Sequence, residues 1–216
     1  MGPSLALALP TFLIGVWINI CVALMVLMFR GSKLDRFAVA VFVTLMSISY
    51  LFYIILGQYF MAKVSRLVPV SGFNDGIDSW RFLILPILIS VIAGIGAGAR
   101  WYRSLFIDVS GQDFARTARA KGVSEAGVLF RHILPNAMLP ILTGVVVVIP
   151  TLFMGSLVME SFFSIPGLGS YLLDAIRAQD FAIVRAMVFL GSVLYIIGLI
   201  LTDISYTWAD PRVRLN

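Results

Sequence analysis

The sequence has little charge, a single cysteine and a single histidine. Only 12% of its 216 residues are charged, about half the share of roughly 25% in an average soluble domain. Cys21 has no second cysteine for an internal disulfide, and His132 alone cannot supply a histidine metal cluster and argues against a catalytic triad. The composition therefore predicts no catalytic residue, no resident cofactor and no metal site.

The sequence also lacks a phosphate-binding loop. Such a loop places lysine and then serine or threonine after glycine, whereas Lys33, Lys63 and Lys121 are followed by leucine, valine and glycine. The chain is thus not expected to hydrolyse ATP by that machinery. A membrane-bound enzyme is disfavoured in the same way, because neither a convergent acid pair nor a Cys–His pair is evident.

Apolar residues dominate what is present, at 60% of the chain with a mean hydropathy of +1.00. A core of this size cannot bury so much apolar surface, so the surplus must face lipid. Backbone groups inside lipid must be paired, and no alternating barrel pattern occurs, which favours helices. We predict an all-α integral membrane protein with about five transmembrane helices, over residues 4–29, 37–60, 82–99, 138–159 and 186–208.

The net charge is +5, and the basic residues lie mainly in loops between these runs. Basic residues in such loops orient a membrane protein and are not a sign of nucleic-acid binding. One side would carry Arg30, Lys33, Arg36, Arg100, Arg103, Arg116, Arg119, Lys121, Arg131, Arg212 and Arg214. The other side would carry only Lys63, Arg66, Arg81, Arg177 and Arg185. The richer side is predicted to be cytoplasmic, with the C-terminus inside and the N-terminus outside.

Three features within the runs are candidates for helix packing or function. Gly94 and Gly98 have the spacing that lets two helix backbones approach in lipid, with chance in a glycine-rich helix as the alternative. Asn19 can bond to a neighbouring helix or line a pathway. Asp203 lies near the end of the last run, which favours an interfacial, solvated carboxylate over a buried functional one.

The loop over residues 100–137 is long and basic, and loops of this length in compact domains are usually functional. Ser110 and Asp113 have the spacing of a helix start, Gly122 interrupts the helical pattern, and Ser124 can cap a second short helix that Pro135 would end. We expect two short helices folded at Gly122. They would lie against a partner or, alternatively, bind anionic lipid as an amphipathic surface helix.

The segment DFARTARAKGVSEAGVLFRHILPNA within this loop resembles the cytoplasmic EAA loop of ABC importer permeases. Gly122 matches the glycine of that loop, Leu134 and Pro135 match its Leu-Pro pair, and Ala118 matches its last alanine. Arg116 and Thr117 depart from its Glu-Ala, in the manner of the oligopeptide, dipeptide and nickel permeases. The stretches RGSKLDR, LVPVSGF, ESFFSIPGLGSYL and ADPRVRL agree in the same order, so the resemblance covers almost the whole chain.

The resemblance implies that residues 1–216 form a single transmembrane permease domain of a binding-protein-dependent importer for peptides, in the bacterial inner membrane. Its partners would be a non-identical second permease, two ATP-binding subunits and an extracytoplasmic substrate-binding protein, with lipid around it. The interface with the ATPase would comprise Arg116, Ala118, Arg119, Lys121, Gly122, Ser124, Glu125, Leu134 and Pro135. An outer loop with Glu160, Pro166, Gly167 and Gly169 would face the pathway and the binding protein.

Some alternatives stay open from the sequence alone. A secondary transporter or channel not driven by ATP is one, although it would need coupling-ion carboxylates and internal repeats. An ordinary Pro-Gly turn is the alternative for the outer loop. Permeases of this type carry a further N-terminal helix that this sequence does not contain. Four explanations stay open for this difference: a truncated sequence, a shortened gene, a split subunit or an inactive remnant.

Overall fold

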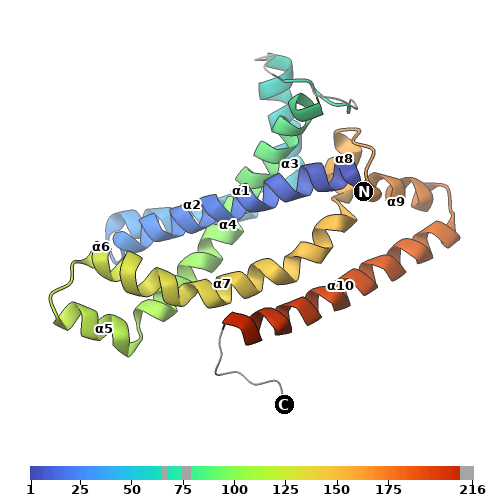
Figure 1. Cartoon of the computed structure of the whole chain (residues 1–216). Coiled ribbons are helices and arrows are strands. Elements are labelled where there is room, and N and C mark those ends of the chain that lie inside the picture. Colours follow the sequence, from blue (N-terminus) through green and yellow to red (C-terminus); the bar gives the residue numbers. More distant parts are fainter. Residues whose placement is uncertain (65–67, 74–78, 210–216) are drawn as a thin grey trace. The chain divides into compact units, whose positions relative to one another are not determined.

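The computed structural model describes residues 1–64, 68–73 and 79–209, except for the side chains of 206–209. Every regular element in these ranges is helical (Figure 1), which confirms the predicted all-α class. The α-helices are α1 (Gly2–Met28), α2 (Lys33–Ser47), α3 (Tyr50–Gly57), α4 (Ser79–Ser110), α5 (Asp113–Ala120), α6 (Glu125–Val128), α7 (Leu134–Val148), α8 (Leu157–Phe162), α9 (Leu168–Arg177) and α10 (Phe181–Ala209). The π-helices η1 (Gln58–Val64) and η2 (Leu129–Ile133) and the 3-10 helix η3 (Ile149–Met154) continue some of them.

Four helical stretches of the described chain are long and apolar enough to cross a membrane: Gly2–Met28, Ser79–Ser110, Glu125–Phe162 and Phe181–Ser205. A fifth results if Lys33–Ser47 and Tyr50–Val64 together make one span. This agrees with the predicted all-helical membrane class, while the limits of each span in the bilayer remain predictions. Arg66, Arg212, Arg214 and parts of the LVPVSGF and ADPRVRL stretches lie outside the described residues.

Two of these stretches are interrupted within their apolar sequence. Helical structure stops after Ser47 and resumes at Tyr50. Further along, α7 passes into η3, and the backbone then leaves the helix at Gly155 and Ser156 before α8. Gly155 has a φ of +71°, which a side chain would strain. Interrupted backbone in lipid is tolerated where protein or a cavity satisfies it.

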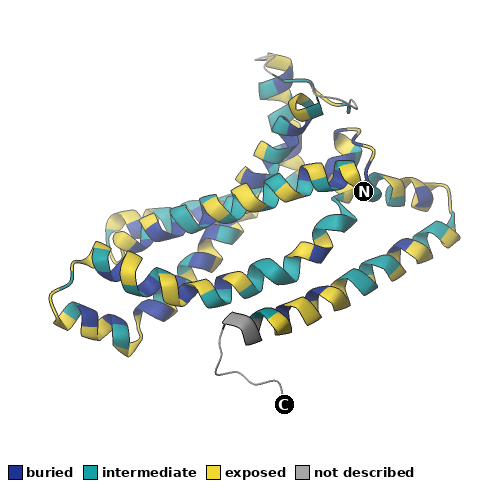
Figure 2. Cartoon of the chain, in the orientation of Figure 1, coloured by how far each residue is buried: buried dark blue, intermediate teal, exposed yellow. Residues whose placement is uncertain are grey.

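The chain packs as two compact units, which are described separately. The first unit comprises Met1–Phe12, Ser49–Val91 and Thr143–Asn216. Its core contains Leu7, Ile54, Leu85, Ile89, Met159, Phe163 and Ile165. Residues of α1, α3, α4 and α8 therefore pack together, although they are distant in the sequence. In the same unit many residues of α10 are exposed along its length (Figure 2), and they include large apolar ones such as Phe181, Phe189 and Ile196, as expected of a helix that faces lipid or another subunit.

The second unit comprises Leu13–Ile48 and Ile92–Leu142, so it contains the long basic loop. Small residues of α4 allow close packing here. A Cβ on Gly96 would lie 2.7 Å from the carbonyl oxygen of Phe42, and one on Gly98 would overlap the amide of Asn19. Gly94 has open space instead. The predicted close approach thus involves Gly98 and Gly96, and Gly94 does not take part within the described chain.

Candidate functional site

The centre of the basic loop is a tight turn between α5 and α6. Gly122 has a φ of +79°, in the left-handed region that favours glycine. The amide of Gly122 donates to the Arg119 carbonyl (2.9 Å) and that of Val123 to the Ala118 carbonyl (3.2 Å). This pair of bonds is the Schellman arrangement that ends a helix. The fold at Gly122 expected from the sequence is therefore present.

The second short helix begins where the sequence predicts. The Ser124 hydroxyl accepts a hydrogen bond from the amide of Gly127 at 3.3 Å, which caps the start of α6. Together with the Gly122 turn, this cap fixes the direction in which the chain leaves α5. The segment from Ser110 to Pro135 is called the Gly122 segment below.

The side chain of Arg119 links three parts of the Gly122 segment by hydrogen bonds. Arg119 donates from Nε to Glu125 Oε1 at 2.9 Å. Its Nη1 and Nη2 reach the carbonyl and the hydroxyl of Ser110 at 3.2 and 3.1 Å. The guanidinium therefore joins the end of α4 to both arms of the turn, because its planar fork can serve several acceptors at once.

The Gly122 segment has a buried face and an exposed face. Its buried side chains are Ala115, Ala118, Val128, Leu129 and Ile133. Its exposed residues include Arg116, Lys121, Gly122, Ser124, Glu125 and Pro135, with Arg119 and Leu134 intermediate. The exposed face is polar, carries both charge signs and surrounds the turn, so it is chemically suited to a protein partner.

Two local predictions about this loop are wrong. Pro135 does not end the second helix, because η2 leads directly into α7, which begins at Leu134. A proline lacks the amide that an α-helix interior needs and crowds the preceding turn, and the wider π turn over Leu129–Ile133 leaves it room. Ser110 does not start a helix either: it ends α4, and Gln112 occupies the N-cap of α5.

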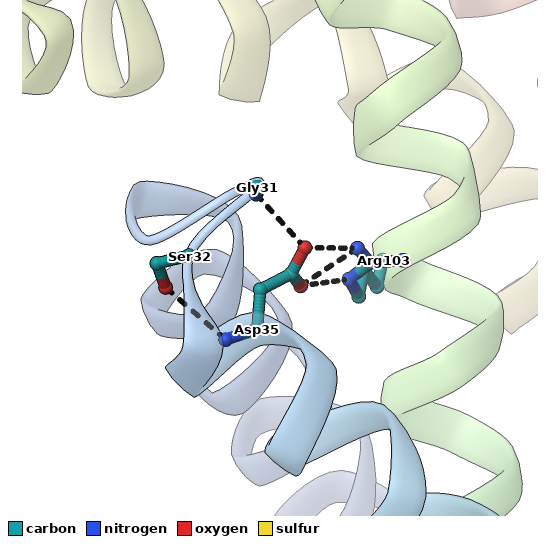
Figure 3. Close-up of polar contacts among 4 residues, drawn as sticks. All are labelled: Gly31, Ser32, Asp35 and Arg103. Atoms are coloured by element: carbon teal, nitrogen blue, oxygen red, sulfur yellow. Dashed lines mark hydrogen bonds and ion pairs between the residues drawn. The ribbon is translucent and has the colours of Figure 1, made fainter.

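An ion pair not foreseen from the sequence ties α2 to α4 in this unit (Figure 3). Arg103 Nη2 donates to both oxygens of Asp35 at 2.7 and 2.9 Å, and Nε donates to Oδ1 at 3.0 Å. Asp35 also accepts the amide of Gly31, while its own amide donates to the Ser32 hydroxyl. The carboxylate is buried, so the pair is a strong geometric restraint and costly to break.

The outer-loop residues form a separate cluster in the first unit. Glu160 is fully buried, and within the described chain no basic side chain pairs with it. Its carboxylate accepts the amide of Ser156 at 3.1 Å and the amide of Ser170 at 3.0 Å. Both amides lie at the starts of helices, α8 and α9, where the helix dipole favours a negative charge. Glu160 thus joins the starts of two helices.

Small residues let the chain approach this carboxylate. A Cβ on Gly167 would overlap Glu160 and the Ser4 hydroxyl, and one on Gly169 would lie 2.7 Å from the amide nitrogen of Leu157. Ser4 accepts the amide of Leu168 at 2.8 Å, which attaches α1 to the loop. Pro166 is exposed beside them. We call Ser4, Ser156, Glu160, Gly167 and Ser170 the Glu160 cluster.

The structure brings the predicted residues together in two groups, one per unit. The Gly122 segment gathers the predicted interface residues, and the Glu160 cluster contains Glu160 and Gly167, with Gly169 and Pro166 beside it. Asp35, Arg103, Ser4 and Ser170 were not foreseen. Ser32 and Asp35 do have the spacing of a capping motif, which signals the start of α2, but nothing local indicates Arg103 as partner.

Comparison with known proteins agrees with these features. Residues 11–215 match the family model described as binding-protein-dependent transport system inner membrane component. A probable peptide ABC transporter permease of Sinorhizobium fredii is 33% identical over 221 residues, covering 99% of this chain and 70% of the relative. A putative peptide transport system permease of Brucella abortus is 37% identical over 218 residues, 99% of this chain and 69% of the relative.

A third relative has a different named cargo. The glutathione transport system permease protein of Salmonella paratyphi A is 34% identical over 213 residues, which cover 98% of this chain and 68% of the relative. The family match spans most of the chain and includes the Gly122 segment and, apart from Ser4, the Glu160 cluster. The chain belongs to the binding-protein-dependent transport system inner membrane components, as a multi-pass, non-catalytic permease subunit of an ABC importer that works with ATPase and binding-protein partners.

Proposed function

We propose that this permease imports peptides and is driven by ATP-binding subunits that grip the Gly122 segment. It would pair with a non-identical second permease, and two ATP-binding subunits would serve the pair. The observation that carries the proposal is the exposed, mixed-charge turn at Gly122, braced by Arg119 and continuous through η2 with the apolar helix α7. The family match favours this mechanism over a secondary transporter or channel.

The segment is suited to carry force. Ala118, Val128 and Ile133 anchor its buried face, and Arg119 holds the two arms against Ser110. Only Gly111 and Gln112 separate α4 from α5, and η2 runs directly into α7, so movement of the turn would be passed to the ends of α4 and α7. Closure of the ATPases on nucleotide would then switch the permease between inward-open and outward-open states.

The peptide class and the orientation rest on two further arguments. Two of the relatives carry peptide in their names and a third carries glutathione, itself a small peptide. The excess of basic residues on the side of the Gly122 segment supports a cytoplasmic position for it and for the C-terminus. The loop around the Glu160 cluster would then lie on the outer side, toward the substrate-binding protein and the mouth of the pathway.

The experiment that tests the proposal is the Gly122→Val substitution in the assembled transporter, reconstituted in proteoliposomes. Valine in the left-handed conformation is strained by roughly 1–2 kcal/mol, and its Cβ projects into open space on the exposed face. We expect normal insertion but loss of uptake and of the ATPase activity that the substrate-binding protein stimulates. Uptake of a radiolabelled peptide and phosphate release measure the two.

The matched control is Gly31→Val. Gly31 has a φ of +81° and also has open space around it, so the backbone strain is the same. It lies between α1 and α2, outside the Gly122 segment, and an unchanged melting temperature of the variant would show that the bond from its amide to Asp35 is kept. Equal losses in both variants would attribute the effect to strain alone. Normal coupled uptake in Gly122→Val would contradict the docking role directly.

A further inference from the structure

The first unit contains a cavity of about 280 Å³. Residues beside both helix breaks line it. Tyr50, the first residue after the break between α2 and α3, lines it. So do Thr151 of η3 and Gly155 and Ser156, where the second stretch leaves its helix. Helix breaks at membrane depth occur where backbone lines a cavity, and they often mark a substrate site.

The lining is hydroxyl-rich and neutral. Five of its lining residues carry hydroxyl groups, and the others are apolar or glycine: the five are Thr11, Tyr50, Ser90, Thr151 and Ser156. Among the described residues that line the cavity, none is charged. Ser90 lies at the middle of the apolar run of α4. We call this site the hydroxyl cavity.

The hydrogen bonds that the hydroxyl groups already make determine which donors and acceptors they have left for a ligand. Thr11 donates to the Leu7 carbonyl and Thr151 to the Val148 carbonyl, both at 2.7 Å. A hydroxyl has one donor and two acceptor lone pairs, so these two threonines have only acceptors left. Tyr50 and Ser90 share one bond at 3.0 Å, which leaves one of their two O–H groups as a donor.

The hydroxyl cavity thus has free acceptors, a free donor and no charge on its lining residues. These properties match the peptide group, which has one N–H and one C=O. An ionised carboxylate or ammonium would lose its hydration here without a countercharge. We propose that the hydroxyl cavity binds the main-chain amides of the transported peptide and so contributes to substrate selection. This inference rests on the proposed peptide class and assigns residues to it.

The Glu160 cluster supports the cavity wall. The Glu160 carboxylate accepts the Ser156 amide, and Ser156 caps α8 through the Met159 amide. The irregular backbone at Gly155 and Ser156 therefore has a fixed course. A site that recognises main-chain groups needs such rigidity, because positions have to be held closely for hydrogen bonds to discriminate.

The test compares uptake of a tripeptide with that of its backbone N-methylated form by the complete transporter in proteoliposomes. N-methylation removes the N–H donors that Thr11 and Thr151 would accept. In Thr11→Val and Thr151→Val the preference for the unmethylated peptide should fall by about 2- to 10-fold, the value of one neutral hydrogen bond. Any effect of methylation on the binding protein cancels, because the same binding protein serves every variant.

Thr44→Val is the matched control. Thr44 also donates to the carbonyl four residues earlier, at 2.9 Å, but lies on α2 outside the hydroxyl cavity. Its preference should equal that of the unmodified transporter. Equal preference in Thr11→Val, Thr151→Val and Thr44→Val would overturn the inference while leaving peptide transport intact. Absence of any peptide uptake by the unmodified transporter would overturn both the proposed peptide class and the inference.

A second measurement identifies the occupant without relying on transport rates. Ala8→Cys places a thiol in the cavity wall, in a chain whose single cysteine has been removed by Cys21→Ala. A charged, water-soluble thiol reagent should label it, and the tripeptide should protect it at least about 2-fold, the occupancy effect of a ligand present near its Kd. Arg177→Cys at the end of α9, where the side chain is 67% exposed and outside the hydroxyl cavity, should be labelled without protection. Labelling that only phospholipid suppresses would identify an acyl-chain site and overturn the inference.

Discussion

Glu160 is a buried carboxylate that has no basic partner among the described residues, so its stabilisation comes from another source. Two backbone amides at the starts of α8 and α9 donate to its two oxygens. Charge-assisted bonds of this kind are stronger than neutral ones. The residue therefore serves to shape the segment from Ser156 to Ser170, and its contact with the transport pathway stays a prediction.

Glu160→Gln should destabilise the subunit. A glutamine retains only one acceptor oxygen, so one of the two buried amides loses its partner, at a cost of about 1–3 kcal/mol. Thermal unfolding in mild detergent measures the loss. Glu125→Gln is the control, because that side chain is 72% exposed and such substitutions usually change stability by less than about 0.5 kcal/mol. Equal melting temperatures in the two variants would contradict the structural role.

At the scale of elements, glycines on two sides of α4 allow close contact with two different helices. Phe42 and Met46 of α2 lie against Gly96, and Asn19 of α1 lies against Gly98. The small residues allow the helices to approach without a side chain between them. A Cβ on Gly94, one turn earlier than Gly98, would meet no atom of the described residues of other helices within 4 Å. The spacing pattern alone therefore cannot tell which glycines make the contact.

Gly96→Leu should weaken the subunit and Gly94→Leu should not. A leucine at Gly96 would collide with the backbone of Phe42 and Met46, and overpacking typically costs about 1–3 kcal/mol. At Gly94 the side chain meets open space, and replacing a helical glycine is favourable by up to about 1 kcal/mol. Thermal unfolding of both variants in detergent compares them. A larger loss for Gly94→Leu would refute the arrangement of α2 and α4.

The elements also show how far sequence reasoning extends. The Gly122 turn and the Ser124 cap were predictable because a few consecutive residues decide them. The continuation of the helix past Pro135 was not, because the π turn that accommodates it depends on the packing of Leu129 and Ile133. Arg103 was foreseen only as a charge in a loop, since its partner lies 68 positions away.

At the scale of the whole molecule, the predicted residues belong to two units with different chemistry. The second unit contains the polar Gly122 segment and the Asp35–Arg103 pair, while the first contains the Glu160 cluster and the hydroxyl cavity. The all-α membrane class followed from composition alone, because the apolar surplus admits few alternatives. The separation of the candidate residues into two units did not follow from the composition, because it depends on packing between distant segments.

The Asp35–Arg103 pair should matter for the whole transporter. Arg103→Leu leaves a buried, unpaired carboxylate and should cost about 3–5 kcal/mol, whereas Asp35→Leu with Arg103→Leu should recover much of that loss. Arg177→Gln, which breaks an exposed pair at 3.9 Å, should cost less than about 1 kcal/mol. Thermal unfolding and peptide uptake measure both effects. A double variant as unstable as Arg103→Leu would contradict this account.

The π turn before Pro135 affects how a movement of the Gly122 turn, as proposed above, would be passed along the chain to α7. The buried residues Leu129, Ile133, Ala137 and Ile141 recur every fourth position. In an ideal α-helix that repeat would wind around the axis by about 40° per step, but the wider turn at η2 takes up part of this winding. These buried residues lead from the Gly122 segment into α7, so a partner that held the segment as proposed would act on the helix through them.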